Sequence, residues 1–266
     1  MTNDSDNRWL IPLLLAAGAG LALWYFLIEV EKPLPVETEP QEPAETAAPR
    51  LGPIHPLEPD SPDAGDRELV PLPPLADSDA YFKLALLELV DRDLDRLLVR
   101  DALIEKVVAT IDNLPRSRVA ERLRPVGTLT EAFVAEPGGD RASFVLGPDN
   151  FRRYDELVDM LNATDLDALV ETYRRFYPLF QEAYVSLGYP NGYFNDRVVE
   201  VIDHLLETPE PGEPVRLVRP NVLYEFADME LESRSAGQKL LLRMGPQHTR
   251  QVKAVLNEIR GRITTQ

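Results

Sequence analysis

Residues 173–209 read YRRFYPLFQEAYVSLGYPNGYFNDRVVEVIDHLLETP and contain two helix patterns joined by a turn. In the first pattern, aromatic residues recur at i, i+3, i+4, i+7 and i+11, which places them on one face of a helix. Residues 189–192 (YPNG) carry proline and glycine at the second and fourth positions of a β-turn, where both are favoured. The segment therefore predicts a helix–turn–helix unit whose aromatic face packs into the core. The aromatic face consists of Tyr173, Phe176, Tyr177, Phe180 and Tyr184.

The second helix pattern has an apolar stripe and an acidic stripe on different faces. We expect Asn191 or Asn195 to cap this helix. Tyr193 and Phe194 are adjacent and point about 100° apart on a helix, so one ring is expected to be buried and the other partly exposed. The apolar stripe is Val198, Val201, Ile202 and Leu205, and the acidic stripe is Asp196, Glu200, Asp203 and Glu207, with His204 four residues after Glu200.

Two interpretations of the acidic stripe stay open. It is either a solvated face, or part of a pocket beneath the preceding helix, which Pro178 is expected to kink.

The rest of the region 76–266 is also mostly helical in pattern, and a helix is predicted over each of the runs 149–163 and 229–244. Asp101 is expected to cap a helix over residues 102–114, and Gly245 with Pro246 separates the last two helices. Two alternating runs around residues 137–140 (PGGD) predict a β-hairpin. A strand-like run over 214–228 is interrupted by Pro220, which favours an edge strand. The fold class predicted is mainly α, a multi-helix globular domain with one or two short β-hairpin or edge-strand elements.

An uncharged apolar run, WLIPLLLAAGAGLALWYFLI, covers residues 9–28 and is long enough to cross a bilayer. The alternative is a cleavable signal peptide, because Ala17-Gly18-Ala19 resembles a cleavage signature. The apolar run continues beyond that tripeptide, which favours a single transmembrane helix. We expect residues 1–8 to form a short cytoplasmic head and the acidic body to lie outside the cytoplasm, although the flanking charges alone do not decide the orientation.

Residues 29–75 contain half of the chain's 24 prolines and almost no periodic apolar pattern. Such a proline-rich, acidic segment cannot bury enough apolar surface to offset its ordering entropy. The sequence therefore predicts a disordered linker over 29–75 between the anchor and a helical extracytoplasmic domain at 76–266.

Composition excludes several classes of function. The formal net charge is −17, which argues against nucleic-acid binding, and no cysteine is present for disulfides or thiolate metal sites. The three histidines, His55, His204 and His248, have no second histidine at ligand spacing. No phosphate loop, metalloprotease motif or nucleophile elbow occurs. We therefore expect no metal and no cofactor.

Three blocks of the body carry a further signal: VATIDNLPR (108–116), residues 173–209 and LVRPNVLYEFADMELESRSAGQKLLLRMGP (217–246). Together with the apolar run and the proline-rich spacer before them, these blocks resemble the domain of unknown function 3014 family of proteobacterial proteins. The similarity extends from Leu75 to about Ile263. It implies a membrane-tethered envelope protein and brings no activity, cofactor or catalytic residue.

The function predicted is a non-enzymatic adaptor or scaffold in the bacterial inner membrane, single-pass, with its C-terminal domain in the periplasm and a protein or glycan partner. The alternative is a hydrolase or lyase acting on an envelope polymer through Asp196, Glu200 and His204. The oligomeric state is not predicted. Basic residues gather in the last two helices, as a solvated face or as a receptor for an acidic segment. The candidate binding residues are Tyr189, Tyr193, Phe194, Asn195, Asp196 and Arg197, and the basic residues are Arg243, His248, Arg250, Lys253, Arg260 and Arg262.

Overall fold

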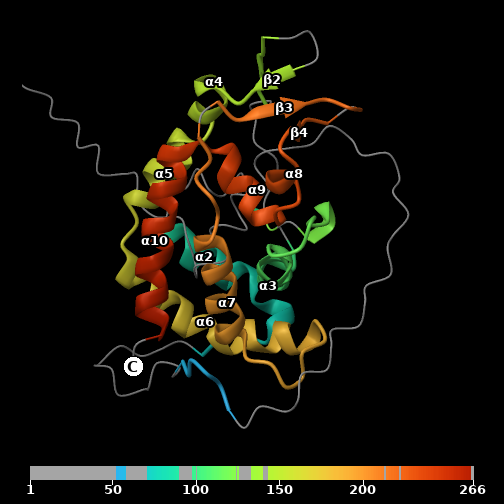
Figure 1. Ribbon diagram of the computed structural model, residues 1–266. Helices are drawn as coiled ribbons and strands as arrows, with labels where there is room; N and C mark the ends of the chain where they lie inside the picture. The colour runs from blue at the N-terminus through green and yellow to red at the C-terminus, as the bar shows by residue number, and fades with distance from the viewer. Residues whose placement is uncertain are drawn as a thin grey trace, which may run out of the picture.

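The computed structural model of the protein describes residues 52–57, 71–89, 98–99, 101–123, 125, 133–139, 143–212, 214–221 and 223–264. These residues form a mainly helical domain with a small antiparallel sheet of four strands at one end (Figure 1). The apolar run at 9–28 lies outside them, and none of the helices in the described ranges has the length and apolar character of a membrane span.

The elements follow one another along the chain as helices interrupted twice by strands. The helices are η1 (Leu75–Asp77), α2 (Asp79–Leu89), α3 (Leu103–Asn113), η3 (Glu121–Leu123), α4 (Pro148–Arg152), α5 (Asp155–Asn162), α6 (Leu166–Ser186), α7 (Phe194–Leu206), α8 (Met229–Glu232), α9 (Ala236–Arg243) and α10 (Pro246–Thr264). The strands are β1 (Glu136–Pro137), β2 (Ser143–Val145), β3 (Arg216–Val218) and β4 (Glu225–Phe226).

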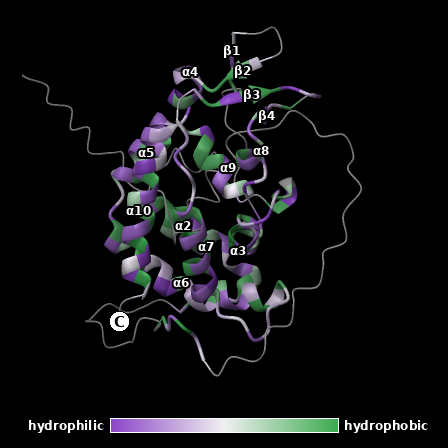
Figure 2. Ribbon diagram, viewed as in Figure 1, coloured by the Kyte–Doolittle hydropathy of each residue, from purple (hydrophilic) through white to green (hydrophobic). Residues whose placement is uncertain are grey.

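Helix α6 contributes its aromatic face to the main core and packs against α2, α3, α7 and α10. Its aromatic face is buried as predicted, except that Tyr177 is only half-buried. Phe82 of α2 contacts Phe176 and Phe180 edge-on, with ring centroids 5.1 and 5.4 Å apart. Edge-to-face pairs of this kind stabilise a core beyond the area they bury. Across the molecule each helix carries both hydrophobic and hydrophilic residues (Figure 2), as expected where one face packs and the other meets solvent.

Two of the predicted helices are each divided in the structure. The pattern over 149–163 forms α4 and α5, and the pattern over 229–244 forms α8 and α9. Helix α9 begins after Ser235, whose side chain accepts a hydrogen bond from the backbone N–H of Gln238. The predicted break between the last two helices is confirmed, because Gly245 adopts a φ of 84° between α9 and α10.

The sheet has the order β1-β2-β3-β4, with every neighbouring pair antiparallel. The β1–β2 hairpin confirms the prediction around residues 137–140. The edge-strand prediction for 214–228 is wrong for β3, which lies between β2 and β4. Pro220 falls in the connection after β3, so its missing N–H does not interrupt the ladder. The aligned positions Phe144, Leu217 and Phe226 belong to a second, smaller hydrophobic cluster on one face of the sheet.

The start of α3 corrects another expectation. Asp101 does not cap this helix; the N-cap residue is Ala102, at a φ of 53°, and it has no side-chain cap. The carboxylate of Asp79 in α2 instead accepts hydrogen bonds from the N–H groups of Ala102 and Leu103, both at 2.7 Å. The cap is therefore a tertiary contact between two helices.

Candidate functional site

The predicted turn before α7 is confirmed, because the N–H of Gly192 donates to the carbonyl of Tyr189 at 3.0 Å. The cap of α7 differs from the prediction: Tyr193 holds the N-cap position, and neither Asn191 nor Asn195 caps the helix. Gln181 of α6 performs this task. Its Oε1 accepts from the N–H of Phe194 at 2.8 Å, and its Nε2 donates to the carbonyl of Gly192 at 2.8 Å. Gln181 thus fixes the N-terminal end of α7 to α6.

The two adjacent rings have different environments, as their spacing predicts. Phe194 is 0% exposed and stacks on Phe180 with ring centroids 5.6 Å apart. Tyr193 is half-buried. Phe194 is therefore part of the core, and Tyr193 is the ring that remains at the surface of the site.

Arg197 and Tyr189 converge on Asp112 of α3, whose side chain is only 2% exposed. Arg197 Nε donates to Asp112 Oδ1 at 2.9 Å, and Tyr189 Oη donates to Oδ2 at 3.0 Å. Arg116 contributes a further ion pair at 3.1 Å. Asp112 was not among the predicted site residues, although a carboxylate within the apolar pattern of residues 103–114 was a usable signal.

We call Asp112, Arg116, Tyr189 and Arg197 the Asp112 cluster, and these contacts shift the pKa of Tyr189 and of Arg197. Burial, and then the nearby charge of Asp112, raises the pKa of the Tyr189 hydroxyl. For Arg197, burial lowers the pKa, but the carboxylates of Asp112 and Glu200 outweigh it, so the pKa is raised. The carboxylate of Asp112 accepts from two charged groups, Arg116 and Arg197, and from the neutral hydroxyl of Tyr189. The Asp112 cluster is therefore a structural ion-pair network that joins α3 to α7.

Asp196 binds a segment that is distant in sequence. Its Oδ2 accepts from the backbone N–H of Ile54 at 2.9 Å, and its Oδ1 accepts from the N–H of His55 at 2.7 Å. These residues belong to the segment 52–57, which lies within the range expected to be linker and is drawn in blue at the end of the molecule away from the sheet (Figure 1). We call residues 52–57 the arm segment. Its Leu57 packs against the main hydrophobic core.

Asn195 completes the contact with the arm segment. Its Nδ2 donates to the carbonyl of His55 at 2.9 Å and to the carbonyl of Ile263 in α10 at 3.1 Å. Its Oδ1 accepts from the hydroxyl of Tyr173 at 3.2 Å, and the residue is 0% exposed. A buried amide with every group satisfied is held in one orientation. Asn195 and Asp196 together therefore recognise two N–H groups and one carbonyl of a peptide main chain.

The alternative catalytic residues lie on α7 and each contact a different neighbour. Asp196 faces the arm segment, whereas Glu200 is exposed and pairs with Arg197 at 2.9 Å. His204 Nε2 lies 2.8 Å from Ser235 Oγ in α9. Burial lowers the pKa of His204, and the charge of Arg197 adds to that effect against the opposing charge of Glu207. Within the described ranges, no three His, Asp or Glu side chains are grouped so as to hold a metal ion.

The basic residues of the last two helices each contact another group of the body. Arg243 lies over the ring of Phe226 at 5.7 Å from its centroid. The others each contact a carboxylate of the same chain: Asp155 for His248, Glu210 for Arg250 and Lys253, Asp203 for Arg260, and Asp167 for Arg262.

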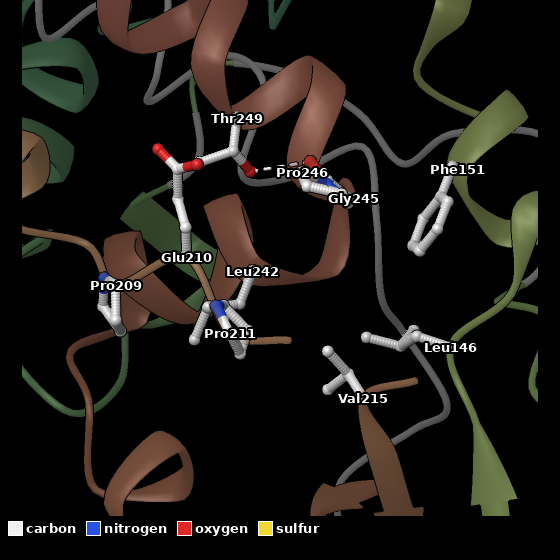
Figure 3. Close-up of a pocket in the computed structure, with 10 residues that line it drawn as sticks. All are labelled: Leu146, Phe151, Pro209, Glu210, Pro211, Val215, Leu242, Gly245, Pro246 and Thr249. Atoms are coloured by element: carbon white, nitrogen blue, oxygen red, sulfur yellow. Dashed lines mark hydrogen bonds between the residues drawn. The ribbon is translucent and has the colours of Figure 1, made fainter. Parts of the chain in front are cut away.

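A small cavity lies elsewhere, between the sheet and the start of α10, with a volume of about 20 Å³. Apolar side chains point into it, including Leu146, Val215 and Leu242, and Thr249 at its rim donates to the carbonyl of Gly245 (Figure 3). This volume holds about one water molecule, so the cavity is a packing gap and not a ligand site.

The sequence matches a known protein family. The sequence model of the family described as "Protein of unknown function (DUF3014)" matches residues 103–260, which is more than half of the chain. No curated protein matches the chain, and no solved structure matches it. The matched range contains the Asp112 cluster and both residues that hold the arm segment.

Proposed function

The chain belongs to the family described as "Protein of unknown function (DUF3014)", whose description names no activity, and from the geometry of the site we propose that it is a tethered, non-enzymatic adaptor that binds a protein partner. Tethering means that an N-terminal anchor and a linker hold the helical body at the membrane surface. Binding takes place at the N-terminal end of α7.

The contact of Asp196 with the arm segment carries this proposal. A carboxylate that accepts two backbone N–H groups forms charge-assisted hydrogen bonds, which are stronger than bonds between neutral groups. These bonds recognise backbone N–H groups of the bound segment and do not depend on a particular side chain. Ile54 illustrates this, because its side chain is 61% exposed while its N–H is bound.

A peptide partner is favoured over a glycan. Sugar recognition commonly uses exposed aromatic faces, but the rings of Phe194 and Tyr184 are buried and contact each other in the core, and Tyr193 is half-buried. The group that the site does hold is peptide main chain. We therefore assign a protein to the partner and leave glycan binding as the outcome that would oppose this assignment.

The tether rests on the sequence. The uncharged apolar run at 9–28 has the length of a single membrane span, and the acidic body favours a position outside the cytoplasm. A periplasmic reporter fused after Gln266 is expected to be active. Activity of a cytoplasmic reporter at the same position, with an inactive periplasmic one, would reverse the topology.

A hydrolase or lyase acting on an envelope polymer is the second candidate function. An acid–base pair needs two groups that reach the same substrate bond, whereas Asp196, Glu200 and His204 each contact a different neighbour. No observation in the described residues favours this activity over binding.

Site-specific photocrosslinking in cells tests the adaptor. A photoreactive amino acid replaces Tyr193, and the same group at Met229, which is 78% exposed near the sheet, serves as the control. We expect position 193 to capture an envelope protein and position 229 not to capture it. Capture should be lost with Asp196→Ala and kept with Glu200→Gln, since Glu200 does not contact the arm segment. The proposal would be contradicted if capture persisted in the Asp196→Ala variant, or if only glycan were captured.

A further inference from the structure

We propose that the N-terminal end of α7 is a site for a proline-bounded peptide, that residues 53–56 (PIHP) are its resident ligand, and that a protein partner binds by presenting a segment of the same kind. This inference rests on the proposed adaptor function and names the chemistry of its partner. The ligand is defined by main-chain donors and by a following apolar residue.

The prolines define which donors the ligand offers. Proline has no N–H, so between Pro53 and Pro56 the only backbone donors are those of Ile54 and His55. Asp196 accepts from both, at 2.9 and 2.7 Å. The tetrapeptide therefore presents no backbone N–H that the site leaves without an acceptor.

The bend in the arm segment explains how one carboxylate reaches both donors. In an extended strand consecutive N–H groups point to opposite sides, but the chain bends at Ile54 and His55. The same arrangement occurs where Asp79 accepts from Ala102 and Leu103 at the start of α3. The protein thus uses a single device twice, once to join two helices and once to hold the arm segment.

The side chains of the ligand have unequal importance. Ile54 is 61% exposed and Pro53 is also exposed, so neither side chain is bound in a pocket. Leu57 packs against the main core, and it stands directly after the second proline. The ligand is therefore a Pro-x-x-Pro sequence followed by an apolar residue, in which proline also limits the conformational freedom lost on binding.

The arm segment must be displaced before another chain can bind. Because it belongs to the same chain, its effective concentration at the site is of the order of millimolar. A free peptide or a partner segment competes with it and binds more weakly than its intrinsic affinity would allow. Removing the two N–H donors of the arm segment is then expected to open the site.

The experiment uses the full chain and a fluorescent synthetic peptide of residues 51–58 (LGPIHPLE). Fluorescence anisotropy compares wild type with a chain carrying both Ile54→Pro and His55→Pro. We expect the double variant to bind the peptide at least about fivefold more tightly than wild type, because the competing segment is weakened. Adding Asp196→Ala to the double variant should reduce peptide binding by about tenfold or more, given the strength of charged hydrogen bonds, and adding Glu200→Gln should leave it unchanged.

Two controls keep the outcome decisive. A peptide in which the central Ile and His are both Pro should not bind, since it has no N–H to offer. If the double variant unfolds, as judged by circular dichroism, the single variant His55→Pro replaces it. Equal affinities for wild type, the opened chain and the Asp196→Ala chain would overturn the inference.

The two proposals fail in different ways. If the opened chain does not bind the peptide but position 193 still captures a protein in cells, the adaptor stands and the ligand class is wrong. If the peptide binds through Asp196 but crosslinking in cells reaches only residues 52–57 of the same chain, the site stands and the adaptor function is wrong.

Discussion

The guanidinium of Arg197 binds both the side chain and the main chain of Asp112. Its Nε donates to the Asp112 carboxylate at 2.9 Å, and a terminal nitrogen donates to the Asp112 carbonyl at 2.8 Å. The two residues are 85 positions apart in sequence, and Asp112 is nearly inaccessible to solvent. The pair fixes the first turn of α7 against the last turn of α3. The orientation of Asn195 and Asp196, which belong to the same turn as Arg197, depends on this junction.

Replacing Arg197 by Met should therefore destabilise the protein by about 3 kcal/mol, because it leaves a buried carboxylate with one cation fewer. The matched control is Arg260→Met, since Arg260 pairs with Asp203 at a more exposed position and such pairs contribute about 0–1 kcal/mol. Urea unfolding of both variants measures the difference. Equal losses would show that the Asp112 cluster has no special weight.

The adjacent rings Tyr193 and Phe194 should respond differently to truncation. Phe194→Ala removes a fully buried ring and should lower the free energy of unfolding by about 3–5 kcal/mol. Tyr193→Ala should change it by less than about 1 kcal/mol, as for other surface substitutions. Thermal or chemical unfolding supplies the comparison, and a larger loss for Tyr193 than for Phe194 is the result that would not fit.

For the cap of α3, the sequence predicts Asp101 and the structure shows Asp79, and mutation distinguishes the two. Asp79→Ala leaves the N–H groups of Ala102 and Leu103 without their acceptor and should cost about 1–2 kcal/mol. Asp101→Ala should be nearly neutral, because the Asp101 side chain is exposed and pairs with Lys106 instead of capping α3. Should Asp101 prove the more important residue, the assignment of the cap to Asp79 would be wrong.

Local patterns predicted the helices well because the helix period is encoded over a few turns. The aromatic face of α6, the turn at 189–192 and the break at Gly245 all follow from residues that are neighbours in sequence. The β1–β2 hairpin follows for the same reason. These features require no knowledge of distant contacts.

Tertiary contacts account for the features that the sequence did not predict. The caps of α3 and α7 come from Asp79 and Gln181, which lie on other helices. The inner position of β3 depends on pairing with β2, about 70 residues earlier in the chain. For the site, the sequence identified Asn195 and Asp196 but not their ligand, since nothing local relates them to Ile54 and His55.

Stability should depend on pH through His204. Burial lowers the pKa of His204 in the folded protein, below the value of about 6.5 expected when it is unfolded. The unfolded chain then binds more protons between these two values, so the protein loses stability as pH falls below about 6.5 and stops losing it once pH is below the folded pKa. The Ser235 hydroxyl next to Nε2 fits a neutral ring that accepts a hydrogen bond.

His204→Gln should remove this part of the pH dependence. Midpoints of thermal unfolding measured at intervals from about pH 7.5 to 5 give the slope for wild type and variant. A variant that keeps the slope of wild type would show that other groups are responsible.

Amide hydrogen exchange of the full chain tests the central claim, that Asp196 holds the arm segment through its main chain. The N–H groups of Ile54 and His55 each donate to a charged acceptor, so their exchange should be slowed by more than about tenfold relative to an unstructured peptide. Asp196→Ala should return both amides to the unstructured rate, and Glu200→Gln should leave them protected. Exchange of Ile54 and His55 at the unstructured rate in wild type, or protection that persists in Asp196→Ala, would contradict the account.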